Sequence, residues 1–210
     1  MVRGFLHMAA LAAAVALLCP PPARACHNGI IYELDDDVRV IVRAEQLVAG
    51  GRDDRALRAA SRAVARMRRA GGRAAQDHIR RAQRVMAVAV VRVGGKVDLG
   101  RYRVVSWTSE PQRLSNLRWA RDLLAGLRGG GGDPVLDARY AEALSRFDDQ
   151  RDEALTILRG LATEDLMPDA WGYRALWDLE RAGGDRTAAA SALAECRARA
   201  GRLAGSICAP

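Results

Sequence analysis

The sequence predicts an all-α fold of consecutive antiparallel helical hairpins, and three observations support this class. From Val38 nearly to the C-terminus, apolar residues recur every three or four positions, which is typical of helices. Glycine and proline interrupt this pattern and leave segments of helix length between them. Half of the 210 residues are hydrophobic, but only 5% are aromatic and alanine is very frequent. We therefore expect the helices to bury surface through close mutual contact instead of large side chains.

Four helices are expected in the first half of the chain. The first ends at Gly50-Gly51, and Asp53 or Asp54 is expected to cap the second. The fourth begins near Pro111, because a first helical turn tolerates a residue without a backbone N–H. The predicted ranges are about 37–49, 53–70, 75–93 and 111–128. Residues 94–110 lack helical periodicity and are predicted to form an irregular insertion.

Four more helices are expected in the second half. Asp133-Pro134 opens the fifth, which is expected to carry Phe147 near its end. Pro168 starts the seventh, and Gly183-Gly184 separates it from the eighth. The predicted ranges are about 134–147, 151–163, 168–182 and 185–202. Eight helices would form four hairpins, of which the second contains the insertion.

The first hairpin carries the most specific pattern in the chain. From Ala44 to Val64 the sequence reads AEQLVAGGRDDRALRAASRAV, which places small residues where two antiparallel helices must approach closely. This segment resembles a tetratricopeptide repeat. The last hairpin is similar, with Ala189, Leu193 and Cys196 on its second helix. The hairpins between them match at the level of architecture.

The resemblance implies a right-handed α-solenoid of about four hairpins over residues 26–210. It also implies a noncatalytic scaffold or adaptor for protein-protein interaction. Such a scaffold would bind a peptide or protein segment on a concave face lined by the first helix of each hairpin. The contacts that it suggests are Arg39 and Arg43, followed by Tyr140 and Tyr173.

The first 25 residues have the pattern of a secretory signal peptide. Arg3 precedes an apolar run from Met8 to Leu18, and Ala23-Arg24-Ala25 forms a small-x-small cleavage site. The run is shorter than the roughly 20 residues that span a bilayer. We therefore expect a periplasmic or secreted protein of the bacterial cell envelope. A lipid anchor on Cys26 is an alternative, although Arg24 departs from the residues that usually precede a lipidated cysteine.

Three cysteines remain after the expected cleavage, and an oxidising compartment favours a disulfide between two of them. Cys196 and Cys208 would close a short loop at the C-terminus, whereas Cys26 with either one would join the two ends of the chain. We favour the first pairing. Cys26-His27 at a freed amino terminus is also a candidate copper or zinc site, because it combines an amine, a thiolate and an imidazole.

Positive charge is concentrated in one region of the chain. The full sequence has a net charge of +8, and residues 52–103 alone carry about +11. On the predicted second helix, arginines recur every three or four positions opposite the apolar face, with no acids between them to offset the charge. We call this set the basic ridge, and it comprises Arg55, Arg58, Arg62, Arg66 and Arg69.

The basic ridge suggests an anionic partner, although a solvated helix face explains the same pattern. An acidic protein is one candidate, and an envelope surface of anionic lipid or glycolipid is the alternative. Nucleic acid is not expected outside the cytosol. Trp107 in the insertion could anchor a partner, because tryptophan and arginine dominate binding hot spots, or it could fold back against the helices.

The sequence contains no pattern typical of catalysis. His27 and His78 are the only histidines after the expected cleavage site, and no serine stands in a nucleophile-elbow context. The glycines of 129–132 are followed by Asp133-Pro134, whereas a phosphate-binding loop ends in Gly-Lys-Ser/Thr. We therefore expect neither enzymatic activity nor a cofactor.

Overall fold

The computed structural model describes residues 29–209. Nearly all of the described residues belong to one compact unit, 34–210. The expected signal peptide over residues 1–25, and the Cys26-His27 pair, lie outside the described residues. Within the described residues, no helix is long and apolar enough to cross a membrane.

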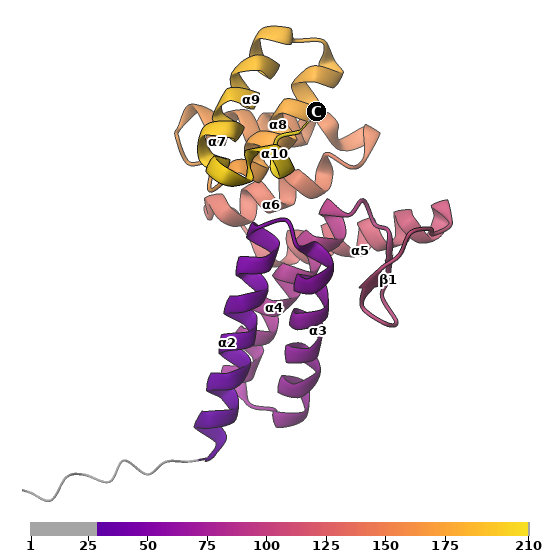
Figure 1. The fold of residues 1–210 in the computed structure, drawn as a ribbon, viewed down its shortest axis with the longest axis vertical. Helices are drawn as coiled ribbons and strands as arrows, with labels where there is room; N and C mark the ends of the chain where they lie inside the picture. The colour runs from indigo at the N-terminus through magenta and orange to yellow at the C-terminus, as the bar shows by residue number, and fades with distance from the viewer. Residues whose placement is uncertain (1–28, 210) are drawn as a thin grey trace, which may run out of the picture. The chain divides into compact units, whose positions relative to one another are not determined.

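The described residues are mostly helical, which confirms the all-α class. Consecutive helices from α3 onward pack against one another, as Figure 1 shows. The long helices are α2 (Gly29–Ala49), α3 (Asp53–Ala70), α4 (Arg73–Arg92), α5 (Glu110–Arg128), α6 (Pro134–Leu144), α7 (Arg151–Thr163), α8 (Ala170–Gly183) and α9 (Arg186–Ala200). Three short helical turns complete the set: η1 (Asp148–Gln150), η2 (Gly201–Leu203) and α10 (Ala204–Ile207).

Several helix ends differ from the predictions. α2 begins at Gly29, eight residues before the expected start at 37. The N-cap of α3 is Arg52, so Asp53 and Asp54 lie in the first turn instead of capping it. α6 ends at Leu144, and Phe147 lies beyond it, buried and with the Arg121 guanidinium 5.0 Å from its ring centroid.

Aspartate caps begin three of the later helices. Asp133, Asp169 and Asp185 each accept hydrogen bonds from backbone N–H groups in the first turn of α6, α8 and α9. Each carboxylate therefore satisfies donors that have no partner within the helix. The breaks before α6 and α9 lie where the sequence predicted them. Pro168 was predicted to start α8, but it precedes the Asp169 cap and the helix begins at Ala170.

The insertion at 94–110 is not wholly irregular. β1 (Val97–Asp98) and β2 (Arg103–Val104) form a two-stranded antiparallel ladder in which Val97 pairs with Val104. Buried Asn116 of α5 donates hydrogen bonds to the carbonyl oxygens of Gly95 and Val97, both at 2.8 Å. The backbone N–H of Val104 donates to Asp54 Oδ1 at 3.0 Å, which attaches the hairpin to the first turn of α3.

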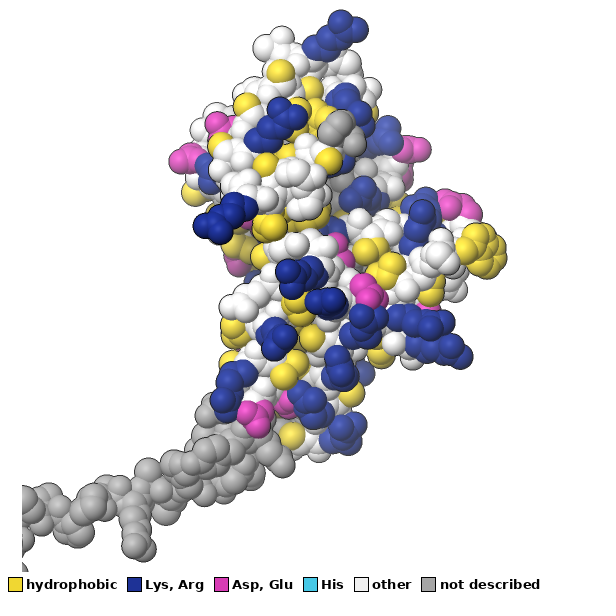
Figure 2. Space-filling view, viewed as in Figure 1, with side chains coloured by type: hydrophobic (Ala, Val, Ile, Leu, Met, Phe, Trp, Pro, Cys, Tyr) yellow, Lys and Arg dark blue, Asp and Glu magenta, His cyan; other side chains and the backbone are white. Residues whose placement is uncertain are grey.

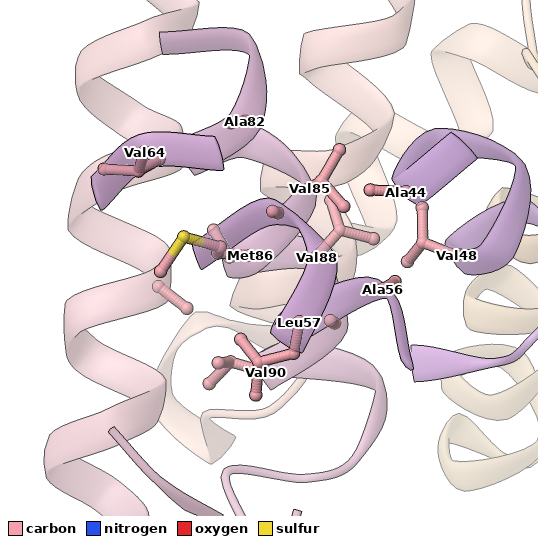
Figure 3. Packing of buried hydrophobic residues seen from close by; sticks show 14 of the residues in the cluster. Ala44, Val48, Ala56, Leu57, Val64, Ala82, Val85, Met86, Val88 and Val90 are labelled. Atoms are coloured by element: carbon pink, nitrogen blue, oxygen red, sulfur yellow. The ribbon is translucent and has the colours of Figure 1, made fainter. Parts of the chain in front are cut away.

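Two hydrophobic cores lie in the unit. The first is formed by α2 to α5 and includes Ala56 and Ala60, both fully buried, so the helices approach closely there as predicted. Figure 3 shows Val88 of α4 pointing toward Val48 of α2 in this core. The second core is formed by α6 to α10. Tyr140 of α6 packs against both cores.

A disulfide attaches the C-terminal segment to the second core. It joins Cys196 of α9 to Cys208, immediately after α10, with a Cα–Cα distance of 6.0 Å. Both cysteines are buried. The pairing is the one favoured from the sequence, and it fixes residues 201–209 beside α8 and α9.

Candidate binding surfaces

The basic ridge follows the solvent side of α3. Leu57, Val64 and Met67 on the opposite side are buried in the first core. This amphipathic arrangement results from the spacing of apolar residues, since positions three and four apart share one side of a helix. All five arginines of the basic ridge are exposed.

Acidic residues outside the basic ridge neutralise part of it, although none lies between its arginines. Arg58 forms an ion pair with Asp54 one turn earlier on α3. Arg66 contacts Asp37 of α2 at 2.5 Å, and Asp37 is buried. The sequence could not show this second pair because its partners lie on different helices. Among the described residues, the other three ridge arginines form no ion pair: Arg55, Arg62 and Arg69.

The positive charge of α4 is also partly neutralised. Arg81 and Arg84 both contact Glu45 of α2, at 2.5 and 3.3 Å. The two suggested contacts on α2, Arg39 and Arg43, are exposed, and Arg39 lies 2.7 Å from Asp36. The uncompensated charge is therefore concentrated on α3.

The β1–β2 hairpin places further basic and aromatic groups beside α3. Tyr102 at its turn has a φ of 49° and helps line a small cavity of about 190 Å³ together with Arg68 of α3. Arg101 and Arg103 are exposed. Figure 2 shows Lys and Arg side chains gathered over α2, α3 and the hairpin. Trp107 is 78% exposed, so it does not fold back against the helices.

The two tyrosines suggested as contacts are not on an open surface. Tyr173 is 4% exposed in the second core, with Arg199 5.1 Å from its ring centroid. Tyr140 is half-buried between the two cores, and Arg128 lies 5.1 Å from its ring centroid. Tyr173 is therefore excluded as a partner contact in this structure.

A buried charged network joins the two cores, and the sequence did not predict it. Arg92 at the end of α4 has a side chain only 2% exposed. Its guanidinium contacts Glu142 of α6 at 3.2 Å and donates to the Val48 carbonyl oxygen at 2.7 Å. Burial lowers the pKa of Arg92, and the neighbouring Glu142 carboxylate opposes that shift.

Arg139 of α6 extends this network to the start of α8. It forms ion pairs with Glu142 and with Asp169, the N-cap of α8. Burial acts to raise the pKa of Asp169, but the Arg139 guanidinium holds it below its usual value. Asp53 lies within electrostatic range of Arg92 and Glu142, yet its Oδ1 is buried without a hydrogen-bond partner. Burial raises the pKa of Asp53 to about 6.

A cavity of about 530 Å³ opens beside this network. We call it the arginine cleft. Its walls come from the ends of α4 and α6, the start of α7, α8 and the C-terminal segment. The charged and aromatic lining comprises Arg92, Arg146, Arg151, Trp171, Arg174 and Arg181, opposed by Glu142 and Asp178.

Two sequence signals could have indicated these buried groups. Arg92 interrupts the run MAVAVVRV, in which the preceding residues are all apolar, and Glu142 stands within the apolar segment YAEAL. A charge inside such a run requires a partner once it is buried. The partner itself is 50 residues away, which sequence spacing alone does not reveal.

The described residues contain no group of three or more His, Cys, Asp or Glu side chains arranged to hold a metal ion. His78 is half-buried on α4. No protein-family model, curated protein or solved structure matches this chain. The candidate surfaces therefore have to be interpreted from their own chemistry.

Proposed function

We propose that this protein is a noncatalytic scaffold of the bacterial cell envelope that binds an acidic protein segment through the basic ridge and Trp107. The observation that carries the proposal is the juxtaposition of uncompensated arginines on α3 with the exposed Arg103 of β2, the strand that packs against α3. Trp107 follows β2 in the segment before α5 and is exposed. Arginine forms bidentate hydrogen bonds to carboxylates, and tryptophan contributes large apolar contact area. Such a surface suits an acidic segment with an apolar anchor.

Helical packing supports the solenoid part of the proposal. Each helix from α3 to α9 contacts the next one in sequence, and the first hairpin has fully buried alanines at its interface. This is the arrangement expected for a tetratricopeptide-like stack of about four hairpins. The Cys196–Cys208 disulfide agrees with an oxidising compartment, as does the expected signal peptide.

The proposal is tested by cross-linking in intact cells, followed by affinity purification of the C-terminally tagged protein and mass spectrometry. A recurrent acidic envelope protein is the expected result. The test variant is the triple charge reversal R55E/R62E/R69E, which should lose that protein. The matched control reverses three exposed arginines of the C-terminal region that form no ion pair in the described residues: Arg186, Arg197 and Arg202.

The control variant changes the net charge by the same amount, so a loss common to both variants would contradict a specific role for the basic ridge. Recovery of the protein alone would also contradict the scaffold. Binding to vesicles containing phosphatidylglycerol, abolished by the triple reversal but not by its control, would replace the protein partner with an anionic lipid surface. Such binding should weaken steeply between low and physiological salt.

A further inference from the structure

The arginine cleft is separate from the basic ridge and has its own excess of positive charge. Five guanidinium groups line it against the two carboxylates of Glu142 and Asp178. Glu142 is occupied by Arg92 and Arg139 in the buried network. Asp178 contacts Arg174 at 3.0 Å and Arg181 at 3.7 Å. Both carboxylates are therefore already shared.

Arg146 is the lining arginine that makes no direct contact with either carboxylate, although both Glu142 and Asp178 act on it electrostatically. Within the described residues its side chain forms no hydrogen bond, ion pair or ring contact. The residue is exposed, but burial of its guanidinium among its neighbours lowers its pKa. The Glu142 and Asp178 carboxylates oppose this shift, and Arg174 adds to it. Arg151 on the same wall pairs only with Asp148, and both of those side chains are at least half exposed. An anion entering the cleft would meet two available guanidinium groups.

The remaining walls of the arginine cleft are fixed in place. Arg92 lies 4.1 Å from the Trp171 ring centroid and holds that ring at one side. Arg174 donates hydrogen bonds to the carbonyl oxygens of Ile207 and Ala209 in the C-terminal segment. The disulfide at Cys208 holds the same segment covalently. The site is thus preformed, which reduces the ordering that a ligand would require.

We propose that the arginine cleft binds a small ligand that carries at least two oxyanion groups, either phosphates or carboxylates. The volume of about 530 Å³ falls within the range of small-molecule sites, roughly 300–1,000 Å³. Planar guanidinium groups recognise both kinds of oxyanion by paired N–H donors. One oxyanion group would contact Arg146, and the second would contact Arg151 or Arg181, which line the same cavity.

The test uses isothermal titration of the full mature protein with pyrophosphate and, separately, with citrate. At least one of these probes should bind, and the R146A/R151A variant should bind it at least about ten-fold more weakly. The matched control is R186A/R197A, which removes two exposed arginines of α9 outside the cleft and should leave the affinity unchanged. Circular dichroism of both variants checks that they are folded.

Two results would overturn the proposal: neither probe binds at millimolar concentration, or R146A/R151A binds as tightly as the unaltered protein. The probe that binds identifies the oxyanion as phosphate or carboxylate. The R55E/R62E/R69E variant should bind the probe normally, because the basic ridge does not line the cleft. Failure of the cleft proposal is therefore distinguishable from failure of the scaffold proposal.

Discussion

The guanidinium of Arg92 lies 4.1 Å from the ring centroid of Trp171, while the indole Nε1 donates to the Ala49 carbonyl oxygen at 3.1 Å. A single aromatic side chain at the start of α8 thereby contacts both the end of α2 and the end of α4. The Trp171 ring also approaches Gly51, where an added Cβ would lie 3.3 Å from it. The two cores thus meet through a charged and aromatic contact.

Replacing Arg92 by alanine should strongly destabilise the protein. The change removes the ion pair with Glu142, the hydrogen bond to Val48 and the stacking on Trp171. We expect the free energy of unfolding to fall by at least about 2 kcal/mol. The loss should be smaller than for a buried charge left without any partner, because Glu142 keeps its ion pair with Arg139. Urea unfolding measures it. The control R186A, at an exposed site, should change the free energy of unfolding by no more than about 0.5 kcal/mol. An equally small change in R92A would contradict a stabilising role of the network.

Asp53 should make the stability of the protein fall as the pH rises. The pKa of Asp53 is about 6 in the folded state, whereas the ordinary value expected for the unfolded chain is 3.8. Between pH 3.8 and pH 6 the folded state therefore binds more protons than the unfolded state. The stability contributed by this group is full below about pH 4 and is lost as the pH rises through 6. The loss amounts to about 3 kcal/mol at neutral pH.

The variant D53N isolates this effect from the other carboxylates. Unfolding free energies at pH 4.5 and pH 7 should show that the variant gains stability over the unaltered protein as the pH rises. A difference between the two proteins that stays constant over this range would contradict a raised pKa at Asp53.

Gly95 should not tolerate alanine. A Cβ there would lie 2.5 Å from the Arg113 carbonyl oxygen and 2.9 Å from Leu117 Cγ, and the residue has a φ of 77°. Gly94 is a matched control, because its φ is 65° but no atom lies within 4 Å of its added Cβ. We expect G94A to lower the free energy of unfolding by about 1 kcal/mol, because alanine is disfavoured in a left-handed backbone conformation. G95A should have a clearly lower melting temperature than G94A. Equal melting temperatures of the two variants would show that α5 moves away from the added Cβ without loss of stability.

The Cys196–Cys208 disulfide should stabilise the second core. Closing a loop over a sequence separation of 12 residues is worth about 3 kcal/mol through the entropy of the unfolded chain. The C196S/C208S variant should therefore melt at lower temperature than the oxidised protein. A reductant should lower the melting temperature of the unaltered protein to that of the variant and leave the variant unchanged. A reductant effect on the variant would indicate a different disulfide.

The helices could largely be located from the sequence because glycine and proline mark their ends. Gly71 and Gly129, for example, follow the last residues of α3 and α5, and both have the positive φ that favours glycine. The early start of α2 could not be predicted, because the regular spacing of apolar residues begins only at Val38. The two-residue strands were missed because they are too short for alternation to appear.

The candidate surfaces were only partly predictable. The exposure of Arg55, Arg62 and Arg69 results from local helical spacing, which the sequence contains. The neutralisation of Arg66 by Asp37 depends on packing between helices, and local spacing says nothing about it. The arginine cleft combines residues from four long helices and the chain end, so no segment of the sequence carries its pattern.

The disulfide has a consequence for when the arginine cleft can be occupied. One wall of the cleft is the segment that Cys208 ties to α9. Reduction of the disulfide would leave this wall held to α8 by the hydrogen bonds from Arg174 to the carbonyl oxygens of Ile207 and Ala209. If the cleft binds the proposed ligand, the affinity should therefore depend on the redox state of Cys196 and Cys208, and the thiol pair would act as a second control on occupancy.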